Sequence, residues 1–338
     1  MNYPHRILEE QPLYLQRINA QPMPVSFGAY RRSDVWEATF NDVQVFGPGF
    51  LHQGVALPDG VWHSGMSHSN HDRFLATVMD SYPTIPDGGY LNTECRLLWG
   101  HHTFMPDIPS NWGHFLWTYL MRLAFIHPLD EWLPLLVSDK VPERFLDWAR
   151  SIGFHEFVRV ADGTRVRRLH VNSVLAHRCA DPGQTVAVLP SAVYALRHRL
   201  GIRLPDSSRV DLYLSRKNAG WRAVTNEPEL IDALKSRHFE TITPETMAIG
   251  EQLSLITRAR KIVVPIGGGS PITMLAPEDC QIVELGFPQI KGVFASAVWA
   301  DVLWQRYVRV NGTPGEQRGP LVIDRDYTVD VGKILEQI

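Results

Sequence analysis

The sequence contains few cysteines, and those that it has are scattered. Cys95, Cys179 and Cys280 form no C-x-x-C pair and are odd in number, which disfavours both a zinc site and a disulfide framework. Such cysteine usage is typical of a reducing compartment, so we expect a cytoplasmic protein.

Long apolar runs and a strong net charge are also missing. No run of about 18 apolar residues occurs, and the first residues lack the apolar stretch of a signal peptide, so we expect no membrane-spanning segment. Peripheral contact with a membrane stays open. The formal net charge of -3 provides no basic field for nucleic acid, so an anionic ligand requires a local cluster of Arg and Lys.

Signals for cofactors are weak. No G-x-G-x-x-G motif is followed by an acidic residue about 20 positions later, which disfavours a nicotinamide-dependent oxidoreductase. Residues 1–110 are rich in histidine, but the nearby carboxylates follow no ligand register, so we expect no bound metal. A role for one or two of these imidazoles in a cleft stays open. The histidines weighed as ligands are His52, His63, His68, His71, His101 and His102.

Strand and helix patterns alternate from residue 133 onward. Hydrophobic residues make up 44% of the 338 residues, which is enough to fill the cores of one large or two medium domains. Residues 1–110 suggest only short strands and loops. The predicted strands are Leu133–Val137, Phe157–Val160, Arg168–Leu175, Val210–Leu214, Phe239–Ile242, Ile262–Val264, Gln281–Leu285, Val308–Val310 and Leu321–Ile323. The predicted helices are Glu143–Ser151, Gln184–Leu200, Glu227–Lys235, Thr246–Ala259 and Val329–Ile338.

This alternation predicts an α/β protein in which helices cover both faces of a parallel sheet. The pattern restarts after the polar, turn-rich segment Arg203–Ser208, which indicates two Rossmann-like domains, residues 1–203 and 204–338. Ligands of such sheets bind at the carboxyl ends of the strands, and in a two-domain protein we expect them in a cleft between the domains.

A triple glycine follows the strand predicted at Ile262–Val264. Gly267, Gly268 and Gly269 precede Ser270, which suits a helix cap, and a short apolar helix follows. Bare backbone N–H groups at such a turn are a ready site for phosphate. The alternative is that the glycines only let a helix pack closely on the sheet.

A cluster of cations directly follows the strand predicted at Val210–Leu214. Ser215, Arg216 and Lys217 come first and Arg222 soon after, so three cations share a loop that opens the helix begun at Asn226. These are the groups that neutralise the charge on a departing diphosphate. A solvated basic loop is the alternative.

Three further positions are candidates. The loop Thr243-Pro244-Glu245 follows a strand and is placed to hold a base or a ribose. Glu284 stands near the end of its strand, where it could accept hydrogen bonds from ribose hydroxyls or pair with a basic neighbour. His114 lies in the first turn of a helix that Asn111 caps and that runs to Leu123. A neutral histidine beside a positive helix end suits a general base, and a buried histidine bonded to a carbonyl is the alternative.

These residues resemble glycosyltransferase family 61 over roughly residues 110–290. The resemblance rests on Leu212–Arg216, Arg222, Asn226-Glu227, Phe239 with Thr241, Glu251-Gln252, Ala259–Gly269, Val283–Leu285, Asn111–Leu116, Pro134–Val137 and Gly153-Phe154. It implies a GT-B fold with two facing Rossmann-like domains. The first is an acceptor-side domain with an irregular, strand-rich first part. The second is a nucleotide-sugar domain whose last helix is expected to pack back on the N-terminal domain. It also implies an inverting, metal-independent transfer, without an essential cofactor, from a nucleotide sugar, usually UDP-linked, to a glycan, a lipid-linked glycan or another hydroxyl acceptor, as in polysaccharide biosynthesis.

The resemblance also implies roles for single residues. Arg216 and Arg222 would hold the diphosphate, with Ser215, Lys217 and Asn226 beside them, and the Gly267–Ser270 turn would contact the donor through N–H groups. Glu284 and the Thr243–Glu245 loop would lie near the nucleoside, with Glu245 as a catalytic candidate, and His114 would face the sugar as a candidate base.

The chain departs from the family pattern at the glycine turn. Ile266 stands where the family has a histidine, and Ile272 where it has an asparagine. The donor contacts at this turn must therefore differ. The departure also motivates an alternative function, a catalytically weakened module that binds a nucleotide sugar or assists a partner enzyme.

Overall fold

The computed structural model describes most of the chain and divides it into two compact units. The described residues are 5–11, 14–16, 33–46, 49–52, 55–58, 87–99, 112–126, 132–172, 176–178, 186–188, 190–203, 208–290, 295–319 and 323–338. Described residues up to Leu200 belong to unit 1, and those from Gly201 onward to unit 2. The acceptor-side and donor-side roles assigned to residues 1–203 and 204–338 stay predictions.

Unit 1 is built on a mixed sheet. Its order is β5-β4-β3-β9-β6-β7-β8, with β1 also paired to β3. From β9 to β8 neighbouring strands are parallel, whereas β1, β3, β4 and β5 pair antiparallel, as β3 does with β9. The sheet is thus Rossmann-like in only half of its width. The strands are β1 (His5–Gln11), β3 (Ser33–Phe46), β4 (Gly49–His52), β5 (Val55–Pro58), β6 (Tyr90–Trp99), β7 (Leu135–Ser138), β8 (Phe157–Val160) and β9 (Arg165–Asn172).

The helical segment that begins with α2 (Trp112–His114) fills the interior of unit 1. It continues as a π-helix, Phe115–Tyr119, and a 3-10 helix, Leu120–Phe125. Residues 115–124 are all buried, which explains why eight of these ten residues are apolar, Thr118 and Arg122 being the exceptions. The Trp112 ring lies 5.2 Å from that of Trp148 in α3 (Glu143–Ser151). A helix was predicted here; the wider π winding was not.

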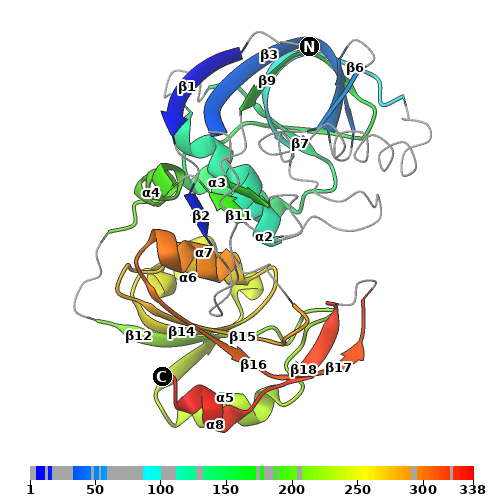
Figure 1. Cartoon of the computed structure of the whole chain (residues 1–338). Helices are drawn as coiled ribbons and strands as arrows, with labels where there is room; N and C mark the ends of the chain where they lie inside the picture. Colours follow the sequence, from blue (N-terminus) through cyan, green and yellow to red (C-terminus); the bar gives the residue numbers. More distant parts are fainter. Residues whose placement is uncertain are drawn as a thin grey trace. The chain divides into compact units, whose positions relative to one another are not determined.

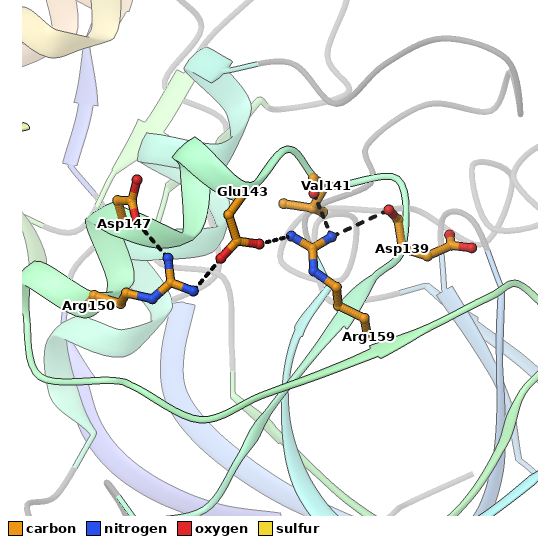
Figure 2. Close-up of polar contacts among 6 residues, drawn as sticks. All are labelled: Asp139, Val141, Glu143, Asp147, Arg150 and Arg159. Carbon is orange, nitrogen blue, oxygen red and sulfur yellow. Dashed lines mark hydrogen bonds and ion pairs between the residues drawn. The ribbon is translucent and has the colours of Figure 1, made fainter. Parts of the chain in front are cut away.

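An ion-pair network fixes the start of α3 against β8 (Figure 2). Glu143 accepts a hydrogen bond from Arg150, about two turns further along α3, and another, at 2.6 Å, from Arg159 of β8. Arg159 also donates to the carbonyl oxygen of Val141 at 2.7 Å. Hydrogen bonds from Arg150 and Arg159 lower the pKa of Glu143. The predicted bounds of α3 and β8 are confirmed.

The helix predicted at Gln184–Leu200 is wrong in its first part. Residues Val186–Val188 form β11, which pairs antiparallel with β10 (Ala176–Arg178) and β2 (Tyr14–Gln16), and α4 begins only at Pro190 and ends at Arg199. Proline lacks the N–H that would bond back into an earlier turn, so it begins a helix more readily than it continues one.

Unit 2 is a parallel five-stranded sheet of order β13-β12-β14-β15-β16. In order of appearance this is 2-1-3-4-5, one of the doubly wound topologies. Figure 1 shows α5 and α8 on one face of the sheet and α6 and α7 on the other, which confirms the predicted α/β layering for this unit. The elements are β12 (Val210–Leu214), α5 (Glu227–Lys235), β13 (Phe239–Ile242), α6 (Ile249–Ile256), β14 (Ala259–Pro265), β15 (Gln281–Gly286), α7 (Ala295–Val302), β16 (Arg306–Asn311) and α8 (Val331–Leu335).

Several predicted ends in unit 2 are wrong. The helix predicted at Thr246–Ala259 is α6 alone, preceded by a 3-10 helix at Pro244–Thr246, and Ala259 already belongs to β14. Ile323 lies in a turn rather than a strand, and the strand nearby is β18 (Arg325–Thr328), paired with β17 (Thr313–Gln317). The closing helix begins after Asp330, whose side chain accepts from Lys333 N at 3.1 Å.

No helix among the described residues is long and apolar enough to cross a membrane.

Candidate functional site

The carboxyl edge of the unit 2 sheet brings three predicted site segments together. Because all five strands are parallel, the residues after β12, β13, β14 and β15 meet at this edge. The loops after β12 and β14 stand side by side at the switch point of the 2-1-3-4-5 order, where doubly wound sheets bind ligands. The cation loop, the Thr243–Glu245 loop and the glycine turn therefore share one edge.

Arg216 lies directly against the glycine turn. A Cβ atom on Gly267 would stand only 1.9 Å from Nη1 of Arg216 and 2.2 Å from its Cζ, so only a glycine leaves room for the guanidinium. Nη2 donates to the carbonyl oxygen of Trp221 at 3.2 Å, while Nε is buried without a partner among the described residues. Burial and the neighbouring Arg222 lower the pKa of Arg216. The site thus holds a partly buried cation whose Nε has no partner among the described residues.

The glycine turn supplies further donors. Within the described residues, no partner is found for the N–H groups of Gly267, Gly268 and Gly269, and each of the three is half-exposed. Ser270 is not the predicted cap: Gly269 holds that position before the 3-10 helix Ser270–Leu275, and the Ser270 hydroxyl donates to Gly267 O at 2.9 Å. Ser270 therefore shapes the turn from inside it.

Glu227, the first residue of α5, is the hub beneath Arg216. Its Oε1 accepts from the Tyr213 hydroxyl at 2.7 Å, from the Ser215 hydroxyl at 2.9 Å and from the N–H of Arg216 at 3.3 Å. The residue is 8% exposed. Our site prediction omitted Glu227, although it stands next to Asn226 among the residues that carry the resemblance to the family. It fixes the backbone at which the cation loop begins.

Arg222 is also placed at this edge. It has a left-handed backbone, φ 61°, which is uncommon outside glycine and is a feature of constrained sites. Its Nε and Nη2 donate to Oδ1 of Asp324 at 3.2 and 2.9 Å. Lys217, the third predicted cation, is exposed, and its N–H donates to the Ser215 hydroxyl at 3.2 Å.

The side chain of Asn226 is hydrogen-bonded within unit 2. Its amide nitrogen donates to Val329 O at 2.9 Å, and its amide oxygen accepts from Val329 N at 3.0 Å. It makes no side-chain cap to α5. The amide thus ties the start of α5 to the segment before α8, and a donor contact for Asn226 stays a prediction.

The Thr243–Glu245 loop joins the cation loop. Asn218 donates to Oε1 of Glu245 at 3.3 Å, and Glu245 is close enough to Arg216 to act on its charge. The buried amide of Gln252 donates to Pro244 O at 2.8 Å and holds the turn from below. Thr243 directs its carbonyl oxygen to Thr246 N at 3.0 Å.

Glu284 lies inside the sheet rather than at its surface. It has no exposed area, and its Oε2 accepts from the Tyr307 hydroxyl at 2.9 Å. Burial raises the pKa of Glu284 to about 7, an effect that Ser296, Arg309 and Tyr307 partly offset. A contact of Glu284 with the nucleoside stays a prediction.

The raised pKa of Glu284 predicts a pH-dependent stability. A carboxyl that binds its proton more tightly in the folded state stabilises the fold fully below its unfolded value, near 4.5, and this is lost as pH rises through about 7. The variant Glu284→Gln cannot ionise and does not lose this stabilisation. From pH 4 to pH 8 we therefore expect its free energy of unfolding to rise by about 3 kcal/mol relative to that of the wild type. Urea unfolding at both pH values measures this, with the exposed Glu278→Gln as control. An equal difference at both pH values would contradict it.

His114 belongs to α2 in unit 1. None of the contacts described above tests its predicted role as a base, which stays a prediction. Of the six histidines weighed as ligands, His63, His68, His71, His101 and His102 lie outside the described residues, and His52 belongs to β4. No group of three or more potential metal ligands occurs within the described part of the chain.

The comparison with protein families decides the class. Residues 112–283 match the family Glycosyltransferase 61, which is more than half of the chain. The chain belongs to glycosyltransferase family 61. It is therefore a glycosyltransferase, with a sugar donor and an acceptor as its substrates. No curated protein matches the chain.

The family region extends from the buried helical segment of unit 1 into β15. It contains Arg216, Glu227, Glu245 and the glycine turn, so the contacts at the switch point are built by the part of this glycosyltransferase that defines its family. Asp324 and the β17–β18 hairpin lie beyond it. Our site prediction missed Asp324, since no local sequence pattern marks it.

Proposed function

We propose that this family 61 enzyme transfers a sugar from a nucleotide sugar, with UDP as the nucleotide, to a hydroxyl of a glycan or lipid-linked glycan, and that it inverts the anomeric configuration. The observation that carries the proposal is the Arg216 guanidinium seated on Gly267 at the switch point of a doubly wound sheet. A partly buried guanidinium, beside N–H groups that have no partner among the described residues, suits the charge that builds on a departing diphosphate.

The same arrangement supports metal-independent chemistry. Arg216, Arg222 and the N–H groups of the turn stabilise the charge of the leaving group in place of a metal ion. A base removes the acceptor proton during a single displacement. His114 and Glu245 are the candidates for that base. We propose a cytoplasmic setting with peripheral membrane contact where the acceptor is lipid-linked.

The apolar departures at the glycine turn leave these contacts untouched. Ile266 and Ile272 are 2% and 0% exposed and pack in the core of unit 2. Their side chains are thus buried beneath the turn, whose N–H groups keep their exposure. This favours a working donor site over a weakened binding module.

A donor panel tests the proposal. UDP-, GDP-, CMP- and dTDP-sugars are added in thermal unfolding, and we expect UDP-sugars at about 100 times their Kd to raise Tm by about 5–10 °C. Transfer and donor hydrolysis are then assayed with and without EDTA, and NMR of the product gives the anomeric configuration.

Each result of the panel has a definite meaning. A shift with another nucleotide alone would correct the donor, and no shift with any of the four would refute the proposed donor class. Binding without transfer or hydrolysis on any acceptor would favour the binding module, and loss of activity in EDTA would refute metal independence.

A further inference from the structure

A buried carboxylate from the carboxy-terminal part of unit 2 fixes Arg222. Both Nε and Nη2 of Arg222 donate to the same oxygen of Asp324, at 3.2 and 2.9 Å. Asp324 is 2% exposed and is itself fixed by the chain around it: its carbonyl oxygen accepts from Arg318 N at 2.8 Å and from Gly319 N at 3.2 Å. The carboxylate therefore holds one edge of the guanidinium from a rigid support.

The strand that follows Asp324 is attached to the same edge of the sheet. Tyr327 of β18 donates its N–H to Ala223 O at 3.0 Å and its hydroxyl to Leu285 O at 3.0 Å. Asp326 accepts from Ala223 N at 2.9 Å. Arg222 thus begins a segment that is pinned to β18, beside the carboxyl ends of β12 and β15.

Arg222 keeps a donor group to spare. Among the described residues, its Nη1 has no hydrogen-bond partner. Arg216 and Arg222 are close enough for mutual repulsion, which contributes to the lowered pKa of Arg216. Two neighbouring guanidinium groups with unused donors favour an anion that bridges them.

We infer that Asp324 is a positioning residue for the donor: it holds the Nε and Nη2 edge of Arg222 so that Nη1, with Arg216, binds the diphosphate. The inference rests on the proposed function and extends it to a residue outside the family region. It predicts that the β17–β18 end of the chain is needed for donor affinity, although it touches no donor atom itself.

Binding of UDP and of inorganic pyrophosphate, measured by calorimetry, tests the inference. We expect Asp324→Ala to weaken both by about tenfold, as loss of an outer-shell partner does elsewhere, and Asp324→Asn, which keeps the accepting oxygen, to weaken them less. With the UDP-sugar donor, KM is expected to rise more than kcat falls. Asp211→Asn is the matched control, because Asp211 is a buried partner of Arg260 at the opposite, amino-terminal end of β12.

A double-mutant cycle separates positioning from stability. Asp324→Ala is expected to have little further effect on binding in an Arg222→Ala background, because there is no guanidinium left to hold. Additive losses of affinity in the double mutant, or an equal loss of affinity in Asp211→Asn, would overturn the inference. The proposed function would still stand in that case, provided that the wild type binds UDP. Failure of the wild type to bind any nucleoside diphosphate or pyrophosphate would refute both.

Discussion

Arg216→Ala is expected to lower kcat/KM for sugar transfer by about 10²- to 10³-fold while the protein stays folded. The loss follows because a preorganised cation aimed at the developing diphosphate charge acts most strongly in the transition state. Folding is spared because, among the described residues, the guanidinium makes one hydrogen bond, to Trp221 O, and its buried Nε has no partner. Transfer kinetics with the donor found in the panel, together with thermal unfolding, measure both quantities.

Two variants complete the Arg216 experiment. Arg258→Ala removes an equal charge just before β14, at the amino-terminal edge of the same sheet, where Arg258 bonds to Ser254 and Ser208. It should leave kcat/KM unchanged. Arg216→Lys keeps the charge without the planar fork and should recover only part of the activity. Near-native transfer by Arg216→Ala would show that the diphosphate lies elsewhere.

Local sequence signals predicted the scaffold of this edge well. β12, β13 and α5 have the predicted bounds, because each is a short apolar or amphipathic run with clear punctuation: polar residues around Val210–Leu214, and Asn226 with Pro228 at the start of α5. The position of Arg216 after a core strand was enough to place it at the carboxyl edge of the sheet.

Contacts between distant residues were beyond such signals. Glu227 resembles any acidic residue in a first helical turn until β12 brings Tyr213 and Ser215 onto its carboxylate. Arg222 resembles a solvated cation until Asp324, about a hundred residues later, binds it. Glu284 was read as an edge residue because it ends an apolar run, yet a strand buried on both faces hides every position.

The contact between Gly267 and Arg216 yields the second large prediction. In Gly267→Ala the new Cβ would stand 1.9 Å from Nη1, so the guanidinium, a flexible side-chain end, must move away. A displacement of about 1 Å in a positioning group can cost about 10²-fold in rate, and we expect kcat/KM to fall by that order. The backbone of Gly267 has φ 157°, so an added side chain also costs about 1–3 kcal/mol of stability, seen as a fall in Tm.

Gly250→Ala supplies the control, because Gly250 lies in α6, outside the turn, and no atom lies within 4 Å of the added Cβ. It adds the same methyl group away from Arg216 and should leave kcat/KM near the wild-type value. In an Arg216→Ala background, Gly267→Ala should cost almost nothing more in activity while its effect on Tm persists. A full second loss there would mean that the methyl group obstructs the donor itself, and the turn would then act through its backbone alone rather than as the seat of Arg216.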